Sequence, residues 1–192
     1  MDFIIVHGAP GCGKTTLSRK LHEHFQSPYF EFGWIPEYRY LTPSLNISQR
    51  QEEQLSFENL IAVVKNYHRH GFKSIILTDL DEARMMDIPH VFLQFNYIIL
   101  TLYVDSDDQI KHRILARKNG NLYKDWKQSV KINATIRARQ KLPNEYRILN
   151  VRDDADLTLH ELLNIIAEHQ PETLKEIPPF HRDDFFTYID QD

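Results

Sequence analysis

The segment Gly8–Thr15 has the residue types and the spacing of a phosphate-binding loop, namely a glycine, four residues and then Gly-Lys-Thr. Glycines allow successive backbone N–H groups to converge on phosphate oxygens, and the N-terminus of a following helix adds partial positive charge there. We expect Lys14 to reach the β- and γ-phosphates of a nucleotide and the Thr15 hydroxyl to bind Mg²⁺. The residues expected to bind the nucleotide are Gly8, Ala9, Pro10, Gly11, Cys12, Gly13, Lys14, Thr15 and Thr16.

The context of this motif supports the prediction, because the pattern is specific only between a strand and a helix. Residues 3–6 form a short apolar stretch typical of a buried strand. Residues 14–25 place apolar side chains on one stripe of a helix. Cys12 is expected to fill space inside the loop, and an oxidation-sensitive thiol is the alternative.

Asp79 ends an apolar segment, residues 74–79, that is predicted to be a strand, and Asp81 follows it closely. Ligands of open α/β sheets bind at the carboxyl ends of the strands, and Mg²⁺ prefers oxygen ligands such as carboxylates. We therefore expect Asp79 to hold the metal and Asp81 to contribute to substrate binding. A cap on the next helix is the alternative for both residues.

Arg113 and Arg117 lie four residues apart on a predicted helix, so they share one face. A cationic helix face beside a polar, glycine-broken stretch is typical of a lid that closes over phosphates, since the arginine fork grips two phosphate oxygens. We expect this lid at about residues 117–128, with an ordinary solvated helix face as the alternative. Arg137 and Arg139 are further candidates for the same role.

The segment after the second predicted strand carries groups suited to binding an acceptor molecule. Glu37 is expected to take the proton of an acceptor hydroxyl or to bind acceptor hydroxyls. Arg39 is expected to pair with an acidic group of the acceptor, and Trp34 to stack on a ring. The alternative for the aromatic residues is a packing role at the edge of the sheet.

The order of the predicted elements, strand and helix in alternation, is the pattern of an α/β protein with a parallel sheet and helices on both faces. Ser48 and Gln51 have the spacing of a capping box at the start of a long helix, which Gly71 is expected to end. The predicted strands cover residues 3–6, 29–32, 74–79, 97–104 and 146–150, and the predicted helices cover residues 14–25, 48–70, 89–95, 107–118, 126–140 and 157–169.

Length, charge and cysteine content narrow the class of protein. A chain of 192 residues suits one domain, which we place at residues 1–170, and its net charge of −4 provides no general attraction for nucleic acid or an anionic membrane. One cysteine cannot form an internal disulfide, no stretch approaches a membrane span of about 20 residues, and a strand begins almost at once, where a signal peptide would lie. A cytoplasmic protein is the expectation. Its tail, residues 171–192, is rich in aromatic residues and is expected to dock on the domain or form an interface, so a homodimer stays open.

The chain resembles the P-loop small-molecule and nucleotide kinases, a group that includes the adenylate, shikimate, gluconate and nucleoside kinases and the chloramphenicol phosphotransferases. The resemblance rests on the glycine-rich loop, the Asp79 strand end, and the strand end at Val104-Asp105 followed by Arg113 and Arg117. It implies a three-layer αβα sandwich with a five-stranded parallel sheet and a helical lid that carries the arginines. It also implies ATP with Mg²⁺ as the phosphoryl donor.

Residues 35–39, Ile-Pro-Glu-Tyr-Arg, are similar to a segment of nicotinamide riboside-type kinases. They are also similar to the acidic strand end of deoxynucleoside kinases, in which that carboxylate acts as the base. Two features depart from these relatives: residues 78–81 replace the expected Asp-Arg-Ser-like triplet, and no shikimate-type set of Asp and Arg is evident. The resemblance therefore leaves the acceptor open.

The sequence thus predicts an enzyme that moves the γ-phosphate of ATP to a hydroxyl of a nucleoside, a sugar or a shikimate-like acceptor. The alternatives are a P-loop ATPase or a nucleotide-binding regulatory protein without an acceptor, and a degenerate member that only binds ligand. A GTPase is disfavoured because the Asn-Lys-x-Asp motif is absent. The predicted catalytic residues are Lys14, Glu37, Asp79, Arg113 and Arg117, and the predicted substrate-binding residues are Trp34, Glu37, Arg39 and Asp81.

Overall fold

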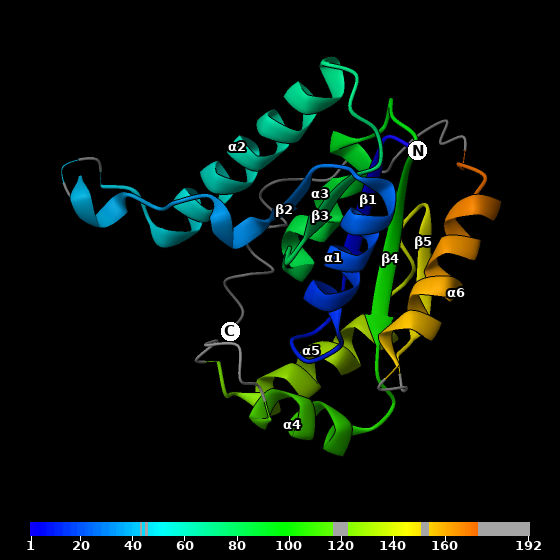
Figure 1. Ribbon diagram of the computed structural model, residues 1–192. Helices are drawn as coiled ribbons and strands as arrows, with labels where there is room; N and C mark the ends of the chain where they lie inside the picture. The colour runs from blue at the N-terminus through cyan, green and yellow to red at the C-terminus, as the bar shows by residue number, and fades with distance from the viewer. Residues whose placement is uncertain (43, 45, 117–122, 151–153, 173–192) are drawn as a thin grey trace.

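The computed structural model describes residues 1–42, 44, 46–116, 123–150 and 154–172. Within these residues, five strands form one parallel sheet in the order β2-β3-β1-β4-β5, with helices on both faces (Figure 1). The predicted three-layer α/β sandwich is therefore confirmed. The strands are β1 (Phe3–His7), β2 (Tyr29–Glu31), β3 (Ile75–Thr78), β4 (Tyr97–Tyr103) and β5 (Glu145–Leu149). The helices are α1 (Lys14–Phe25), α2 (Gln49–Arg69), α3 (Glu82–Val91), α4 (Asp107–Leu115), α5 (Trp126–Ala138) and α6 (Ala155–Glu168), with short 3₁₀ helices η1 (Phe32–Trp34) and η2 (Arg39–Leu41).

The side chains of the central strand β1 alternate between two hydrophobic cores, one on each face of the sheet. Ile4 and Val6 belong to the core that includes residues of α1, α4, α5 and α6, whereas Phe3 and Ile5 belong to the core with α2 and α3. A parallel strand buried on both faces is apolar without a break, which is why this stretch could be recognised from sequence. The loop that follows it emerges at the same end of the sheet as α4 and α5 (Figure 1).

One predicted helix was misplaced. The sequence predicts a helix over residues 89–95, but α3 spans Glu82–Val91 and contains Pro89 near its end. The side chain of Asp81 caps α3 by accepting a hydrogen bond from the Arg84 backbone N–H at 2.8 Å. The capping box of Ser48, by contrast, is confirmed at the start of α2.

Asp2 ties the start of β1 to neighbouring segments. Its carboxylate accepts hydrogen bonds from the Lys73 ammonium at 2.7 Å, the Asn96 backbone N–H at 3.0 Å and the His68 ring at 3.0 Å. Burial acts to raise the pKa of this carboxyl, but these hydrogen bonds together lower it to about 2. The ionised carboxylate therefore contributes to the stability of the fold.

The sign of this contribution gives a test. Because the folded-state pKa lies below the unfolded value of about 3.9, the stabilisation is complete above that value and is lost as the pH falls towards about 2. We expect Asp2→Asn to lower the free energy of unfolding by about 2 kcal/mol at pH 7 and by much less at pH 2.5. Urea denaturation at both pH values measures this difference, and an equal loss at both would contradict it.

Candidate active site

The loop between β1 and α1 has a backbone that requires glycine. Gly8, Gly11 and Gly13 have φ values of +141°, +92° and +96°. A Cβ atom on Gly8 would lie 2.3 Å from the backbone oxygen of Leu102, so the loop also passes too close to β4 for any side chain there. Gly13 forms the N-cap of α1, which places Lys14 and Thr15 in the first turn of the helix. Backbone N–H groups at such a helix start are suited to binding an anion.

Asn150 is a buried residue that the sequence analysis missed, and its side chain supports this loop through hydrogen bonds. The Asn150 side-chain amide donates a hydrogen bond to the Cys12 backbone oxygen at 2.8 Å, and its oxygen accepts one from the Thr158 hydroxyl at 3.1 Å. Asn150 follows β5 directly, and Thr158 lies on α6. A Cβ atom on Gly13 would lie 2.6 Å from the Asn150 amide nitrogen, so the two residues are closely fitted. The position directly after a strand was the signal available in the sequence.

A second asparagine holds the same loop to the end of β4. Asn133 on α5 pairs with both backbone polar groups of Val104, at 3.1 and 2.7 Å, and its oxygen accepts a hydrogen bond from the Cys12 thiol at 3.6 Å. Cys12 is fully buried, and burial raises the pKa of its thiol. This environment agrees with a space-filling role for Cys12.

We expect Asn150→Asp to weaken both the fold and the binding of ATP. A carboxylate oxygen would face the Cys12 carbonyl, leaving that acceptor without a donor and adding a buried charge, at a cost of about 2–3 kcal/mol in unfolding free energy. Because the loop would shift, the Kd for ATP should rise about ten-fold, a change of about 1.4 kcal/mol. Urea denaturation and calorimetric titration measure the two effects. Asn164→Asp, on the exposed surface of α6, is the matched control and should change neither.

Lys14 and Asp79 meet at the carboxyl edge of the sheet. The Lys14 Nζ atom lies 3.5 Å from Asp79 Oδ1; the lysine side chain is 9% exposed and the aspartate side chain 55% exposed. Asp79 follows β3 with a φ of +68°, a conformation that is uncommon for residues other than glycine and that recurs at functional sites. The structure therefore brings together two of the predicted catalytic residues.

The oxygen donors beside Lys14 suit a magnesium ion bound together with phosphates. The Thr15 hydroxyl lies in the first turn of α1, and Asp79 contributes a largely exposed carboxylate. In the described part of the chain, no group of three or more His, Cys, Asp or Glu side chains could hold a metal ion. Mg²⁺ commonly takes only one or two protein carboxylates and completes its shell with water and phosphate oxygens, so these donors fit it.

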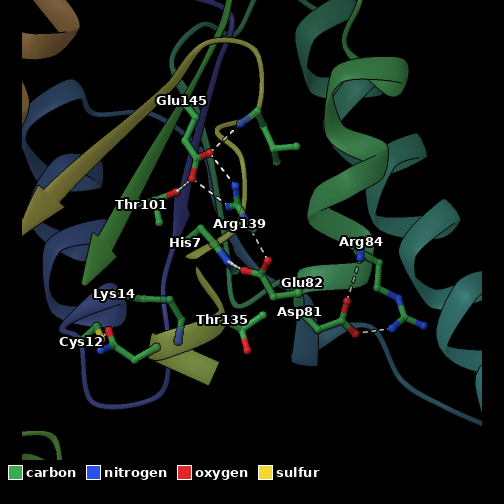
Figure 2. Close-up of polar contacts among 12 residues, drawn as sticks. His7, Cys12, Lys14, Asp81, Glu82, Arg84, Thr101, Thr135, Arg139 and Glu145 are labelled. Carbon is green, nitrogen blue, oxygen red and sulfur yellow. Dashed lines mark hydrogen bonds and ion pairs between the residues drawn. The ribbon is translucent and has the colours of Figure 1, made fainter. Parts of the chain in front are cut away.

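A chain of ion pairs lies beside this edge, between α3 and β5 (Figure 2). His7, the last residue of β1, contacts the Glu82 carboxylate at the start of α3. Arg139 bridges Glu82, at 2.7 Å, and Glu145, at 2.7 and 2.8 Å. Glu145 in turn accepts a hydrogen bond from the Thr101 hydroxyl at 2.6 Å. Sequence spacing does not reveal this network, because its members lie up to 138 positions apart in the sequence. Only the formation of the sheet brings them into contact.

Burial and charge act in opposite directions on the two carboxylates of this network. Burial acts to raise the pKa of Glu82, but His7 and Arg139 hold it below its usual range. Burial likewise acts to raise the pKa of Glu145, but hydrogen bonds from Arg139 and Thr101 outweigh it and lower the pKa. Both groups are therefore ionised at neutral pH.

The structure places Asp81 as the N-cap of α3, where its carboxylate also pairs with the Arg84 guanidinium (Figure 2). Arg84 is almost fully buried and reaches Glu53 on α2 at 3.3 Å. Arg113 donates to the backbone oxygen of Asn150 at 2.9 Å, behind the glycine-rich loop.

The structure describes only some of the residues that belong to the lid prediction. Arg117, with the rest of residues 117–122, lies outside the described residues. Arg137 is exposed, with its guanidinium 5.7 Å from the centre of the Tyr103 ring. These observations leave the lid as a prediction.

The segment after β2 carries the residues predicted to bind the acceptor. Among the described residues, no contact joins these candidates to Lys14. Glu37 is exposed between η1 and η2, and Glu31 is the residue that ends β2. The rings of Trp34 and Tyr29 meet edge to face, with their centres 5.2 Å apart, and Trp34 is 54% exposed. Arg39 faces a buried carboxylate that sequence reasoning missed, Glu52 on α2, at 3.7 Å.

Known proteins were compared with this chain in sequence and in fold. The family model described as an AAA domain matches residues 3–74, a segment that contains the glycine-rich loop. A search of the curated proteins finds no match. Among the described residues, no helix has the length and apolar character needed to cross a membrane.

Several solved structures are similar to this chain over most of their length. A sugar kinase from a Janibacter species is 16% identical, with 87% of this chain and 95% of that chain covered and a TM-score of 0.61. A gluconokinase from Sinorhizobium meliloti is 12% identical (88% and 98% covered, TM-score 0.56). A shikimate kinase from Acinetobacter baumannii, in complex with shikimate, is 18% identical (87% and 93% covered, TM-score 0.52). At such low identities the likeness shows the fold, which these proteins share.

Proposed function

Since the chain has the fold of the P-loop small-molecule kinases, we propose that it transfers the γ-phosphoryl group of ATP to a hydroxyl group of a small molecule. One observation carries the proposal. Lys14 begins a helix behind a loop with three positive-φ glycines, and its ammonium lies 3.5 Å from Asp79 at the end of the neighbouring strand. This arrangement places a cation, an anion-binding helix start and a metal-binding carboxylate at one edge of the sheet.

In this proposal the glycine-rich loop and the start of α1 bind the phosphates of ATP. Thr15 and Asp79 hold Mg²⁺, which when bound neutralises charge on the phosphate oxygens. Lys14 contacts the β- and γ-phosphates and stabilises the charge that spreads over the transferred group. Phosphoryl transfer depends mostly on positioning and electrostatics, so these groups supply much of what the reaction needs.

We assign the remaining roles to two arginines and to residues of the segment after β2. In a domain that spans residues 1–170, Arg113 on α4 and Arg117, at the start of a lid at about residues 117–128, would neutralise phosphate charge. Glu37, whose exposed carboxylate lies on the loop after β2, would orient the acceptor hydroxyl and take its proton. Trp34 and Arg39 would line the acceptor side.

ATP turnover with and without candidate acceptors tests the proposal. The panel contains nucleosides, sugars and shikimate-like acids, and the products are identified to show where the phosphoryl group goes. Strong stimulation by an acceptor, with phosphate on its hydroxyl, is the expected result. ATP hydrolysis at the same rate with every acceptor would instead favour a P-loop ATPase. A thermal-shift screen with a non-hydrolysable ATP analogue adds a binding readout, because a bound acceptor raises the melting temperature by mass action.

A further inference from the structure

The segment that carries Glu37 buries few of its own large side chains. It consists of the short helices η1 and η2 and the residues between them, and the side chains of Trp34, Tyr38 and Tyr40 are all exposed. A segment with few buried apolar contacts opens easily unless specific contacts hold it. The position of Glu37 therefore depends on the contacts that flank it.

On the amino-terminal side of Glu37, two apolar side chains anchor the segment. Phe32 and Ile35 pack against the hydrophobic core that includes residues of α2 and α3. The guanidinium of Arg84, on α3, lies 5.6 Å from the centre of the Phe32 ring. Pro36 comes next, with a restricted φ and no backbone N–H to donate. Hydrogen bonds that hold the backbone near Glu37 must therefore come from the residues after it.

On the carboxyl-terminal side, one buried carboxylate holds the backbone. Glu52, in the first turn of α2, accepts hydrogen bonds from the backbone N–H groups of Tyr38 and Arg39, the second at 2.5 Å. Both bonds end on the same oxygen, and the other oxygen lies 3.7 Å from the Arg39 Nε atom. Hydrogen bonds to an ionised acceptor are stronger than those between neutral groups. Glu52 thus fixes the two residues that directly follow Glu37.

The start of α2 is itself tied to the edge of the sheet where Asp79 lies. Glu53, the residue after Glu52, lies 3.3 Å from the buried guanidinium of Arg84. Arg84 also pairs with Asp81, two residues after Asp79 (Figure 2). Contacts of two adjacent glutamates therefore connect the segment with the proposed base to the strand end with the proposed metal-binding carboxylate.

From these contacts we infer that Glu52 is a positioning residue for phosphoryl transfer. By holding the backbone directly after Glu37, it keeps that carboxylate where it takes the proton of the acceptor hydroxyl. The inference rests on the proposed function and deepens it. Glu52 is buried and acts through Glu37 without meeting a ligand. Misplacing a reacting group by about 1 Å can cost about 10²-fold in rate, so loss of this anchor should appear in kcat.

A matched pair of substitutions separates the hydrogen bonds of Glu52 from its shape. Glu52→Gln keeps an oxygen that accepts from both N–H groups, whereas Glu52→Met has a similar length and helix propensity but offers only a weakly accepting sulfur. With the acceptor found in the panel, we expect Glu52→Met to lower kcat about 10–100-fold. Glu52→Gln should stay within about three-fold of the wild type. The Kd for ATP should not change, because Asn150 and the three glycines shape the proposed phosphate site.

A double-mutant cycle shows whether Glu52 acts through Glu37. If it does, Glu52→Met should lower kcat much less in the Glu37→Gln background than in the wild type, so the two losses are not additive. Glu58→Met removes an exposed carboxylate from the same helix and should leave kcat unchanged. Urea denaturation checks that each variant folds, and Glu52→Ala takes the place of Glu52→Met in the cycle if the larger side chain prevents folding.

Several results would overturn the inference and leave ATP-dependent transfer to the acceptor standing. These are additive losses in the cycle, a wild-type kcat in Glu52→Met, and a wild-type kcat in Glu37→Gln. Equal losses in Glu52→Gln and Glu52→Met would also contradict it, because the ion pair with Arg39 would then matter more than the hold on the backbone. Transfer to no compound of the panel, with ATP still bound, would instead overturn the proposed function itself.

Discussion

Replacing Lys14 with alanine is expected to lower kcat/KM for phosphoryl transfer about 10²–10³-fold, the usual cost of removing one donor that stabilises transition-state charge. The loop backbone would remain, because glycine conformation and the Asn150 brace set its shape. The loss should therefore appear in kcat more than in the unfolding free energy. Steady-state kinetics with the acceptor found in the panel, together with urea denaturation, separate the two.

Lys20→Ala provides the matched control for this variant. Lys20 lies on the same helix and forms a solvent-facing ion pair with Asp156 at 2.7 Å. Surface pairs of this kind contribute little, so turnover should be within about two-fold of the wild type. If Lys14→Ala kept full activity, the assignment of the glycine-rich loop as the phosphate site would be wrong.

Gly8→Ala is expected to have the largest effect on folding. The new Cβ atom would lie 2.3 Å from the Leu102 backbone oxygen, and the φ of +141° is one that residues with a side chain rarely adopt. Overpacking and backbone strain together should cost about 3–5 kcal/mol of unfolding free energy. The loop would move away from β4, so ATP affinity should fall as well.

Gly71→Ala separates the cost of overpacking from the cost of backbone strain. Gly71 also has a positive φ, +92°, but no atom lies within 4 Å of the site that a Cβ would occupy. Only backbone strain applies there, and we expect a loss of about 1–2 kcal/mol. Urea denaturation of both variants measures the difference, and equal losses would show that the close approach of Gly8 to β4 is unimportant.

The sheet and the glycine-rich loop could be predicted because their signals are local. A strand buried on both faces is continuously apolar, and the loop needs fixed residue types at fixed spacing. The predicted helix at residues 89–95 was wrong, because Asp81 caps α3 and the helix begins at Glu82; a capping role was the alternative that the sequence left open for Asp81. Sequence alone does not rank the residues that could begin this helix.

Much of the site could not be predicted, because its contacts depend on tertiary structure. Asn150 and Glu145 look like ordinary polar residues near a strand until the sheet brings one to the glycine-rich loop and the other to Arg139. Glu52 lies on the buried side of a helix where a carboxylate is unusual, yet nothing in the spacing indicates that it faces Arg39.

The strand order also bears on whether the amino-terminal part of the chain could fold on its own. The AAA-domain match ends at residue 74, just before β3 begins, so the matched segment contains β1 and β2. These two strands are not neighbours, since β3 lies between them. The nucleotide motif also depends on Asn150, which belongs to the opposite half of the chain. The matched amino-terminal segment is therefore no autonomous module, because an excised fragment would expose unpaired strand edges and leave the glycine-rich loop without its contact to Asn150.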